Sequence, residues 1–136
     1  MNFKTEKDLM KYMLQHTKTI AVIGLSDNPN RTSYQIAKAM QASGYRIIPV
    51  NPNATTVLGE KSYPSILDVD ETFELVNVFR KPIYLEEIAA DIVQTNAPFV
   101  WFQQGLFNEN AKSFLEERKK YVIMNQCIKV AHSLLL

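Results

Sequence analysis

Hydroxyl and basic side chains that could hold an anion directly follow an apolar run near the start of the chain. Residues 19–33 read TIAVIGLSDNPNRTS, in which Gly24 ends the run and Ser26, Arg31 and Ser33 come after it. Gly24 allows a tight turn or a close backbone approach, and the free N–H groups at the start of a following helix attract phosphate. The segment therefore predicts a phosphate-binding loop. The alternative is that Ser33 only caps its own helix and Gly24 only turns the chain.

Basic side chains also follow two later apolar runs. Arg80 and Lys81 come after the third run, and Lys129 comes after the last. The formal net charge of the chain is only +1, so no global field would attract nucleic acid. Together with Arg31, these cations predict a local site for a polyanionic small molecule. For Lys129, a solvated position outside the site is the alternative.

The residues after the second apolar run argue against a site for NAD. The fingerprint G-x-G-x-x-G is absent, because Gly24 is the single glycine of the first loop. An NAD site has an acidic residue at the end of the second strand, where it binds the ribose hydroxyls. Here that place reads Val50, Asn51, Pro52. NADP would require a nearby arginine, and the nearest one, Arg46, lies at the start of the strand.

Alternating strands and helices are needed to position these residues. Strands are expected over residues 19–25, 45–51, 73–79, 99–105 and 121–127, and helices over 5–16, 33–44, 83–96 and 108–120. The polar stretch 52–72 is expected to be a loop with at most one helical turn. This alternation predicts an α/β, three-layer Rossmann-type fold with a five-stranded, mostly parallel sheet and an extra N-terminal helix. Right-handed crossovers favour the strand order 3-2-1-4-5, with the ligand near the switch between strands 1 and 4.

Length and composition fit one domain over residues 1–136. Hydrophobic residues make up 46% of the chain and charged residues 21%, the balance of an ordinary globular protein. No apolar run approaches the roughly 20 residues that a membrane helix needs, and the first residues lack the apolar core of a signal peptide. The single cysteine excludes an internal disulfide. We therefore expect a cytoplasmic protein that does not bind membranes.

Six segments of the chain together resemble a known family. They read GLSDNPNRTSYQIAKAM, GYRIIPVNP, LGEKSYPSILDV, NVFRKP, VWFQQG and NQCIKVAH. In this order and spacing they resemble the coenzyme A-binding proteins, small stand-alone proteins similar to the amino-terminal domain of the succinyl-coenzyme A synthetase α subunit. The resemblance extends from Thr19 to His132. It implies a Rossmann-type domain that holds coenzyme A along the carboxyl edge of its sheet.

The resemblance also implies contacts at three strand ends. Those that would meet phosphate groups are Gly24, Leu25, Ser26, Arg31, Thr32 and Ser33. Those beside the nucleotide are Val50, Asn51 and Pro52. Those over the adenine and ribose-phosphate region are Phe79, Arg80, Lys81 and Pro82. Coenzyme A carries a pyrophosphate and a 3′-phosphate, and several cations would balance these charges.

Two other functions are alternatives to a coenzyme A-binding module: an enzyme that acts on a coenzyme A thioester, and an NAD(P)-binding regulatory domain. Cys127 and His132 could act as nucleophile and base, but nothing in the sequence places them within hydrogen-bond reach. The chain also departs from the family here, because Asn125, Gln126 and Ala131 occupy places that are often charged. Since the resemblance ends before the synthetase's catalytic domain would begin, we expect binding without catalysis.

No metal site is expected, because the histidines and the cysteine show no ligand spacing. Two tyrosines near the predicted loops, Tyr34 and Tyr63, could stack on an adenine. The alternative for both is a half-buried structural position.

Overall fold

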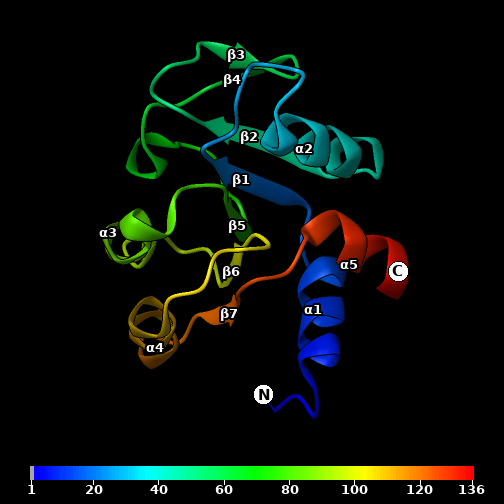
Figure 1. Cartoon of the computed structure of the whole chain (residues 1–136), viewed down its shortest axis with the longest axis vertical. Coiled ribbons are helices and arrows are strands. Elements are labelled where there is room, and N and C mark those ends of the chain that lie inside the picture. Colours follow the sequence, from blue (N-terminus) through cyan, green and yellow to red (C-terminus); the bar gives the residue numbers. More distant parts are fainter. Residues whose placement is uncertain (1) are drawn as a thin grey trace.

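A five-stranded parallel sheet lies between two layers of helices in the computed structural model, which describes residues 2–136 (Figure 1). The sheet contains β1 (Thr19–Ile23), β2 (Arg46–Val50), β5 (Leu75–Val78), β6 (Phe99–Phe102) and β7 (Tyr121–Ile123). The helices are α1 (Glu6–Gln15), α2 (Thr32–Ala42), α3 (Leu85–Ile92), α4 (Glu109–Glu117) and α5 (Ile128–Leu135). A separate antiparallel hairpin consists of β3 (Thr56–Val57) and β4 (Glu60–Lys61). The predicted α/β class, the parallel sheet and the N-terminal helix are confirmed.

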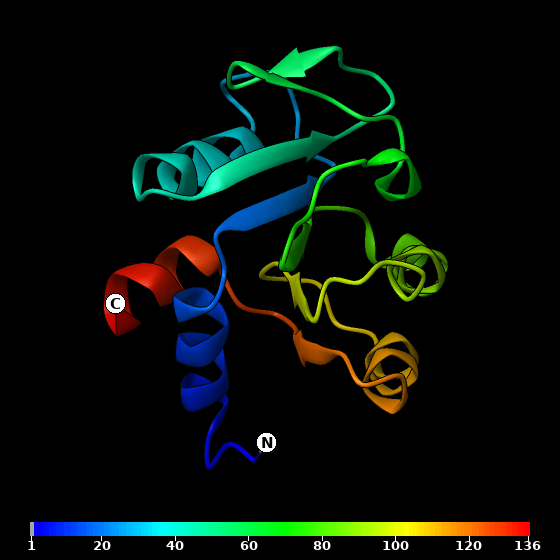
Figure 2. The same cartoon turned by 180° about the vertical axis from the view of Figure 1, so that it is seen from behind.

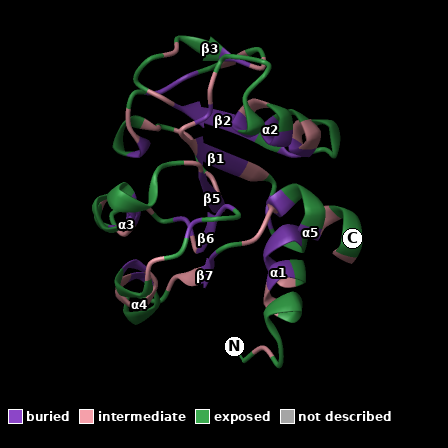
Figure 3. Cartoon of the chain, viewed as in Figure 1, coloured by how far each residue is buried: buried purple, intermediate pink, exposed green. Residues whose placement is uncertain are grey.

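Each face of the sheet is covered by its own group of helices. Helices α1, α2 and α5 pack on one face, and α3 and α4 pack on the other, as the two opposite views show (Figures 1 and 2). Successive side chains of a strand point to opposite faces, so Ile20 and Val22 enter the first core and Ala21 enters the second. Because both faces are covered, the central strands are buried along their length (Figure 3). None of the helices among the described residues has the length and hydropathy to cross a bilayer.

The order of the strands across the sheet differs from the prediction. The observed order is β2-β1-β5-β6-β7, which is 2-1-3-4-5 when these five strands are counted along the chain, and the predicted 3-2-1-4-5 is wrong. The third strand, β5, pairs in parallel with β1 instead of extending the sheet beyond β2.

Pro49 gives the physical reason why β2 lies at the edge. A proline has no N–H, so inside a sheet it removes one hydrogen bond of the ladder. The carbonyl oxygen of Pro49 accepts a hydrogen bond from the N–H of Tyr63 at 3.0 Å, on the side of β2 away from β1. In a parallel strand the N side and the carbonyl of one residue point the same way, so the missing donor falls on the open edge. The change of winding direction therefore lies between β1 and β5, and not between the first and fourth strands.

Three local elements also differ from the prediction. The last strand ends at Ile123 rather than at residue 127, and the helix α5 follows where none was expected. The loop 52–72 contains the hairpin β3–β4 in addition to the anticipated single helical turn, a 3₁₀ turn over Ile66–Asp68. The two-residue hairpin turn has positive φ at both Leu58 (55°) and Gly59 (78°). Leucine rarely adopts this conformation. The residue types therefore gave no signal for a hairpin turn at this position.

Candidate functional site

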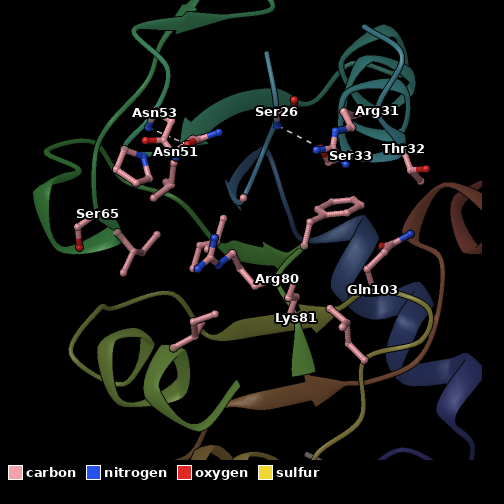
Figure 4. A pocket seen from close by; sticks show the side chains of 18 of the residues that line it. Ser26, Arg31, Thr32, Ser33, Asn51, Asn53, Ser65, Arg80, Lys81 and Gln103 are labelled. Atoms are coloured by element: carbon pink, nitrogen blue, oxygen red, sulfur yellow. Dashed lines mark hydrogen bonds between the residues drawn. The ribbon is translucent and has the colours of Figure 1, made fainter. Parts of the chain in front are cut away.

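A cleft of about 1060 Å³ opens at the carboxyl edge of the sheet (Figure 4). Its walls come from the loops after β1, β2, β5 and β6, from the first turn of α2, from one face of α3 and from the 3₁₀ turn over Ile66–Asp68. Twelve of the thirteen residues predicted from the sequence line it: Gly24, Ser26, Arg31, Thr32, Ser33, Val50, Asn51, Pro52, Phe79, Arg80, Lys81 and Pro82. The carboxyl edge is also where open parallel sheets bind ligands, at the point where the winding reverses.

Gly24 lies where the ends of β1, β2 and β5 come together. Its N–H donates a hydrogen bond to the carbonyl oxygen of Val50 at 2.8 Å. On the other side, a Cβ at this position would lie 2.1 Å from the carbonyl oxygen of Phe79. The backbone φ is also +83°, a conformation that glycine adopts without strain. Gly24 therefore allows the strand end and the loop after β5 to approach within contact distance.

Hydroxyl groups fix the shape of the loop after β1. The hydroxyl oxygen of Ser33 accepts a hydrogen bond from the N–H of Ser26 at 3.1 Å (Figure 4), and that of Ser26 accepts one from Asn28 N–H at 3.0 Å. The alternative that Ser33 only caps its own helix is not observed, because α2 begins at Thr32 and the capping position is Arg31. Ser33 is buried and ties the loop to the helix, and its hydroxyl proton stays available as a donor.

The N-terminus of α2 has no side-chain cap. At α1 and α4 the side chains of Thr5 and Asn108 accept hydrogen bonds from N–H groups of the first turn, at 3.1 and 2.8 Å. The capping residue of α2, Arg31, makes no such bond and has no acceptor to offer. Thr32 and Ser33 in the first turn both line the cleft. The N–H groups of this turn and the positive end of the helix dipole can therefore hold an anion.

Asn51 holds two loops of the cleft together. Its Nδ2 donates to the carbonyl oxygen of Leu25 at 2.9 Å, and its Oδ1 accepts from the N–H of Asn53 at 2.9 Å (Figure 4). Both ends of the amide are thus used inside the protein. Leu25 is the one predicted residue that does not line the cleft, because its side chain is fully buried in the core. Leu25 contributes to the loop structure through its backbone carbonyl, which accepts the hydrogen bond from Asn51.

The cations of the cleft are exposed and have no carboxylate partner. Among residues 2–136, none of the ion pairs within 4.0 Å involves Arg31, Arg80 or Lys81. Arg80 therefore forms no ion pair with the glutamates at the start of α3 among residues 2–136. Its guanidinium lies 4.7 Å from the ring centroid of Tyr84 instead. Lys129 lies on α5 and does not line the cleft.

Several lining residues were not identified from the sequence. They are Asn30, Asn53, Pro64, Ser65, Ile66, Glu87, Ile88, Asp91 and Leu106. Glu87 and Asp91 are four residues apart on α3, so a signal for a shared helix face was present in the sequence. Ser65 caps the 3₁₀ turn, where its Oγ accepts from Leu67 N–H at 3.2 Å. The turn brings Pro64, Ser65 and Ile66 to the cleft only because its chain crosses back over β1, which the predicted strand order did not include.

The suggested nucleophile and base do not form a pair. Cys127 precedes α5, is half-buried against the core below α1 and α2, and does not line the cleft. The ring of His132 packs edge-on against Tyr45 at 5.6 Å between centroids, and no hydrogen bond among the described residues joins it to Cys127. Tyr63 is also outside the cleft. Its hydroxyl donates to Asp70 Oδ1 at 2.8 Å, and this hydrogen bond raises the pKa of the Tyr63 phenol to about 12.

Comparisons with known proteins identify related sequences and structures. A family model described as a CoA binding domain matches residues 18–133. The uncharacterized protein YneT of Bacillus subtilis (strain 168) is 49% identical over 124 residues, which are 91% of this chain and 92% of YneT. A solved structure, a hypothetical protein from Pyrococcus horikoshii OT3, shares 32% identity with a TM-score of 0.91 and covers 97% of this chain and 93% of its own.

A larger enzyme contains a related segment. The ADP-forming acetate–CoA ligase II of Archaeoglobus fulgidus is 28% identical over 109 residues, which are 79% of this chain. The match spans only 16% of the ligase. The similarity thus concerns one part of that enzyme.

Proposed function

Because this chain belongs to the CoA binding domain family, we propose that it binds coenzyme A or an acyl-CoA in the cleft at the carboxyl edge of the sheet. One observation supports this most strongly. The uncapped N-terminus of α2 opens onto the same cleft as three basic side chains, Arg31, Arg80 and Lys81, that have no carboxylate partner within residues 2–136. A small molecule with several phosphates fits both features.

In this proposal, the pyrophosphate lies against the first turn of α2 and the loop from Gly24 to Ser33. The N–H groups of the turn and the hydroxyls of the loop donate to it. Arg80 and Lys81, on the loop after β5, balance the remaining phosphate charge. The nucleoside lies between the end of β2 and the loop after β5, where Pro52, Phe79 and Pro82 offer apolar surface.

Asn51 supports coenzyme A over NAD as the ligand. An NAD site uses a side chain at this position to accept hydrogen bonds from the ribose. The Oδ1 of Asn51 already accepts from Asn53 N–H, and Nδ2 already donates to Leu25 O. The amide of Asn51 is thus held by the loops of the cleft, and it is neutral where an NAD site has a carboxylate for the ribose hydroxyls.

We propose binding without a reaction of the chain's own. The cleft-lining residues include no histidine and no cysteine, and Cys127 is held outside the cleft. An enzyme acting on a thioester would need an activated nucleophile. The carboxylates that line the cleft, Asp27, Glu87 and Asp91, make no hydrogen bond to a serine or threonine hydroxyl among residues 2–136.

Thermal unfolding with added ligands tests this proposal. A ligand that binds only the native state stabilises it by about 2.7 kcal/mol at a hundredfold excess over its dissociation constant. Coenzyme A should raise the melting temperature, and NAD and NADP should leave it unchanged. A clear rise with NAD and none with coenzyme A would overturn the proposal.

A further inference from the structure

Two buried amide side chains lie at the end of the cleft opposite β2. Gln103 directly follows β6, lines the cleft and is only 5% exposed. Asn77 is in the middle of the neighbouring strand β5 and is 2% exposed. Figure 4 shows Gln103 on the far side of the cleft from Asn51, beyond the loop that carries Lys81. Buried amides in a sheet are costly unless their hydrogen bonds are satisfied, so their partners define what they do.

The hydrogen bonds of both amides fix which way each one points. Asn77 Nδ2 lies 3.1 Å from the carbonyl oxygen of Trp101, which can only accept. Gln103 Oε1 lies 3.3 Å from the backbone N–H of Ile128, which can only donate. Asn77 Nδ2 also donates to the same Oε1 at 3.4 Å. Turning the Asn77 amide around would place its Oδ1 against the carbonyl oxygen of Trp101. Turning the Gln103 amide around would place its Nε2 against the N–H of Ile128.

This orientation leaves one hydrogen-bond donor without a partner. No acceptor for Gln103 Nε2 is present among residues 2–136, whereas its Oε1 has two donors. Within the same residues, no fully buried side-chain nitrogen or oxygen lacks a partner. The Nε2 atom of Gln103 is therefore exposed to solvent, although most of the side chain is buried.

We propose that Gln103 donates from Nε2 to a carbonyl oxygen of the ligand, and that Asn77 is a positioning residue that keeps the amide in this orientation. The inference rests on the proposed function. Coenzyme A has amide carbonyls in its pantetheine arm, and an acyl-CoA adds a thioester carbonyl. β6 is two strands away from β1 on the side opposite β2, so Gln103 lies away from the proposed nucleoside position and toward the arm.

Titration calorimetry with three ligands tests the donor. The ligands are coenzyme A, acetyl-CoA and 3′-phospho-ADP, which has the nucleotide but no arm. Gln103→Met, of similar length but without the amide, should weaken coenzyme A about three- to tenfold, the loss of one neutral hydrogen bond. It should leave the affinity for 3′-phospho-ADP unchanged. Gln15→Met makes the same exchange on the exposed end of α1 and should change neither affinity.

A second variant separates the donor from simple packing. Gln103→Glu retains an oxygen that can accept from Ile128 and Asn77 but replaces the free donor by another oxygen. It should weaken coenzyme A at least as much as Gln103→Met. An equal loss for coenzyme A and acetyl-CoA assigns the contact to a pantetheine amide, and a loss for acetyl-CoA alone assigns it to the thioester carbonyl.

The positioning role of Asn77 is tested by a double-mutant cycle. Asn77→Leu should weaken coenzyme A in the parent protein but add no further loss in the Gln103→Met background, where a merely structural effect would persist. Should Asn77→Leu not fold, Asn77→Asp serves in the same cycle. If the parent binds all three ligands and Gln103→Met weakens neither coenzyme A nor acetyl-CoA, or weakens all three ligands equally, the inference is overturned while the proposed function stands. If the parent binds neither coenzyme A nor 3′-phospho-ADP, both the proposed function and the role of Gln103 are refuted.

Discussion

Replacing Arg80 by alanine should weaken coenzyme A binding without unfolding the protein. Arg80 lies on the loop after β5, lines the cleft and is exposed, with no carboxylate within 4.0 Å among the described residues. A hydrogen bond between a charged group and a phosphate contributes about 1.5–3 kcal/mol. Exposure to solvent favours the lower end of this range, which corresponds to about a tenfold rise in Kd. The lost contact with the Tyr84 ring at 4.7 Å should cost stability by at most about 1 kcal/mol.

Titration calorimetry at low and at high salt measures this effect. Salt weakens the interaction between exposed charges, with a screening length of about 10 Å at 0.1 M ionic strength, so the affinity of the parent should fall as salt is added. Arg80→Ala should show a smaller fall, since one screened contact is gone. Arg118→Ala is the matched control, because Arg118 is also exposed and also lies over an aromatic ring, 3.8 Å from the centroid of Phe114, but directly after α4 and outside the cleft.

Equal affinity of Arg80→Ala and the parent at both salt concentrations would refute the role of Arg80. An equal loss in Arg118→Ala would show that the effect is one of net charge rather than of a contact in the cleft.

Three further outcomes follow from the structure. Gly24→Ala should lower the melting temperature more than Gly105→Ala, because both have positive φ (83° and 89°) but only the first Cβ would meet a backbone oxygen; equal losses would contradict the close approach at Gly24. Cys127→Ser should leave the Kd for coenzyme A unchanged by calorimetry, and rapid covalent capture of an acyl thioester by the parent, lost in the variant, would instead make the cysteine catalytic. Since the pKa of the Tyr63 phenol is raised to about 12 in the folded protein, its hydrogen bonds stabilise the fold below pH 10 and are lost between about pH 10 and 12. Denaturant unfolding should therefore show a steeper fall in stability over this range for the parent than for Tyr63→Phe, and identical profiles would argue against the shift.

The sequence was sufficient to predict the edge of the sheet at which the cleft lies. Residues after parallel strands meet at the carboxyl edge whatever the order of the strands, so Gly24, Asn51 and Arg80 were grouped correctly although the strand order was wrong. The order itself was signalled by Pro49, which a central strand would not tolerate. The predicted order 3-2-1-4-5 instead followed the Rossmann-type winding of doubly wound sheets, which places the second strand inside the sheet.

Other features could not be predicted because they depend on distant contacts. The role of Ser33 in fixing the loop needs the position of Ser26, and local spacing alone favoured an N-cap. The hairpin turn contains Leu58 at a φ of 55°, which contradicts the ordinary preference of leucine. The fixed orientation of Gln103 depends on Asn77 and Ile128, each at least 25 residues away in the chain.

Native mass spectrometry of the protein mixed with equimolar coenzyme A and NAD tests the central claim most directly. Both ligands compete in one sample, so the comparison is independent of protein activity and concentration. We expect a one-to-one adduct with the mass of coenzyme A and none with NAD, and the coenzyme A adduct should decrease in Arg80→Ala. An adduct with NAD alone, or none with coenzyme A at concentrations that saturate ordinary cofactor sites, would contradict the assignment of the cleft to coenzyme A.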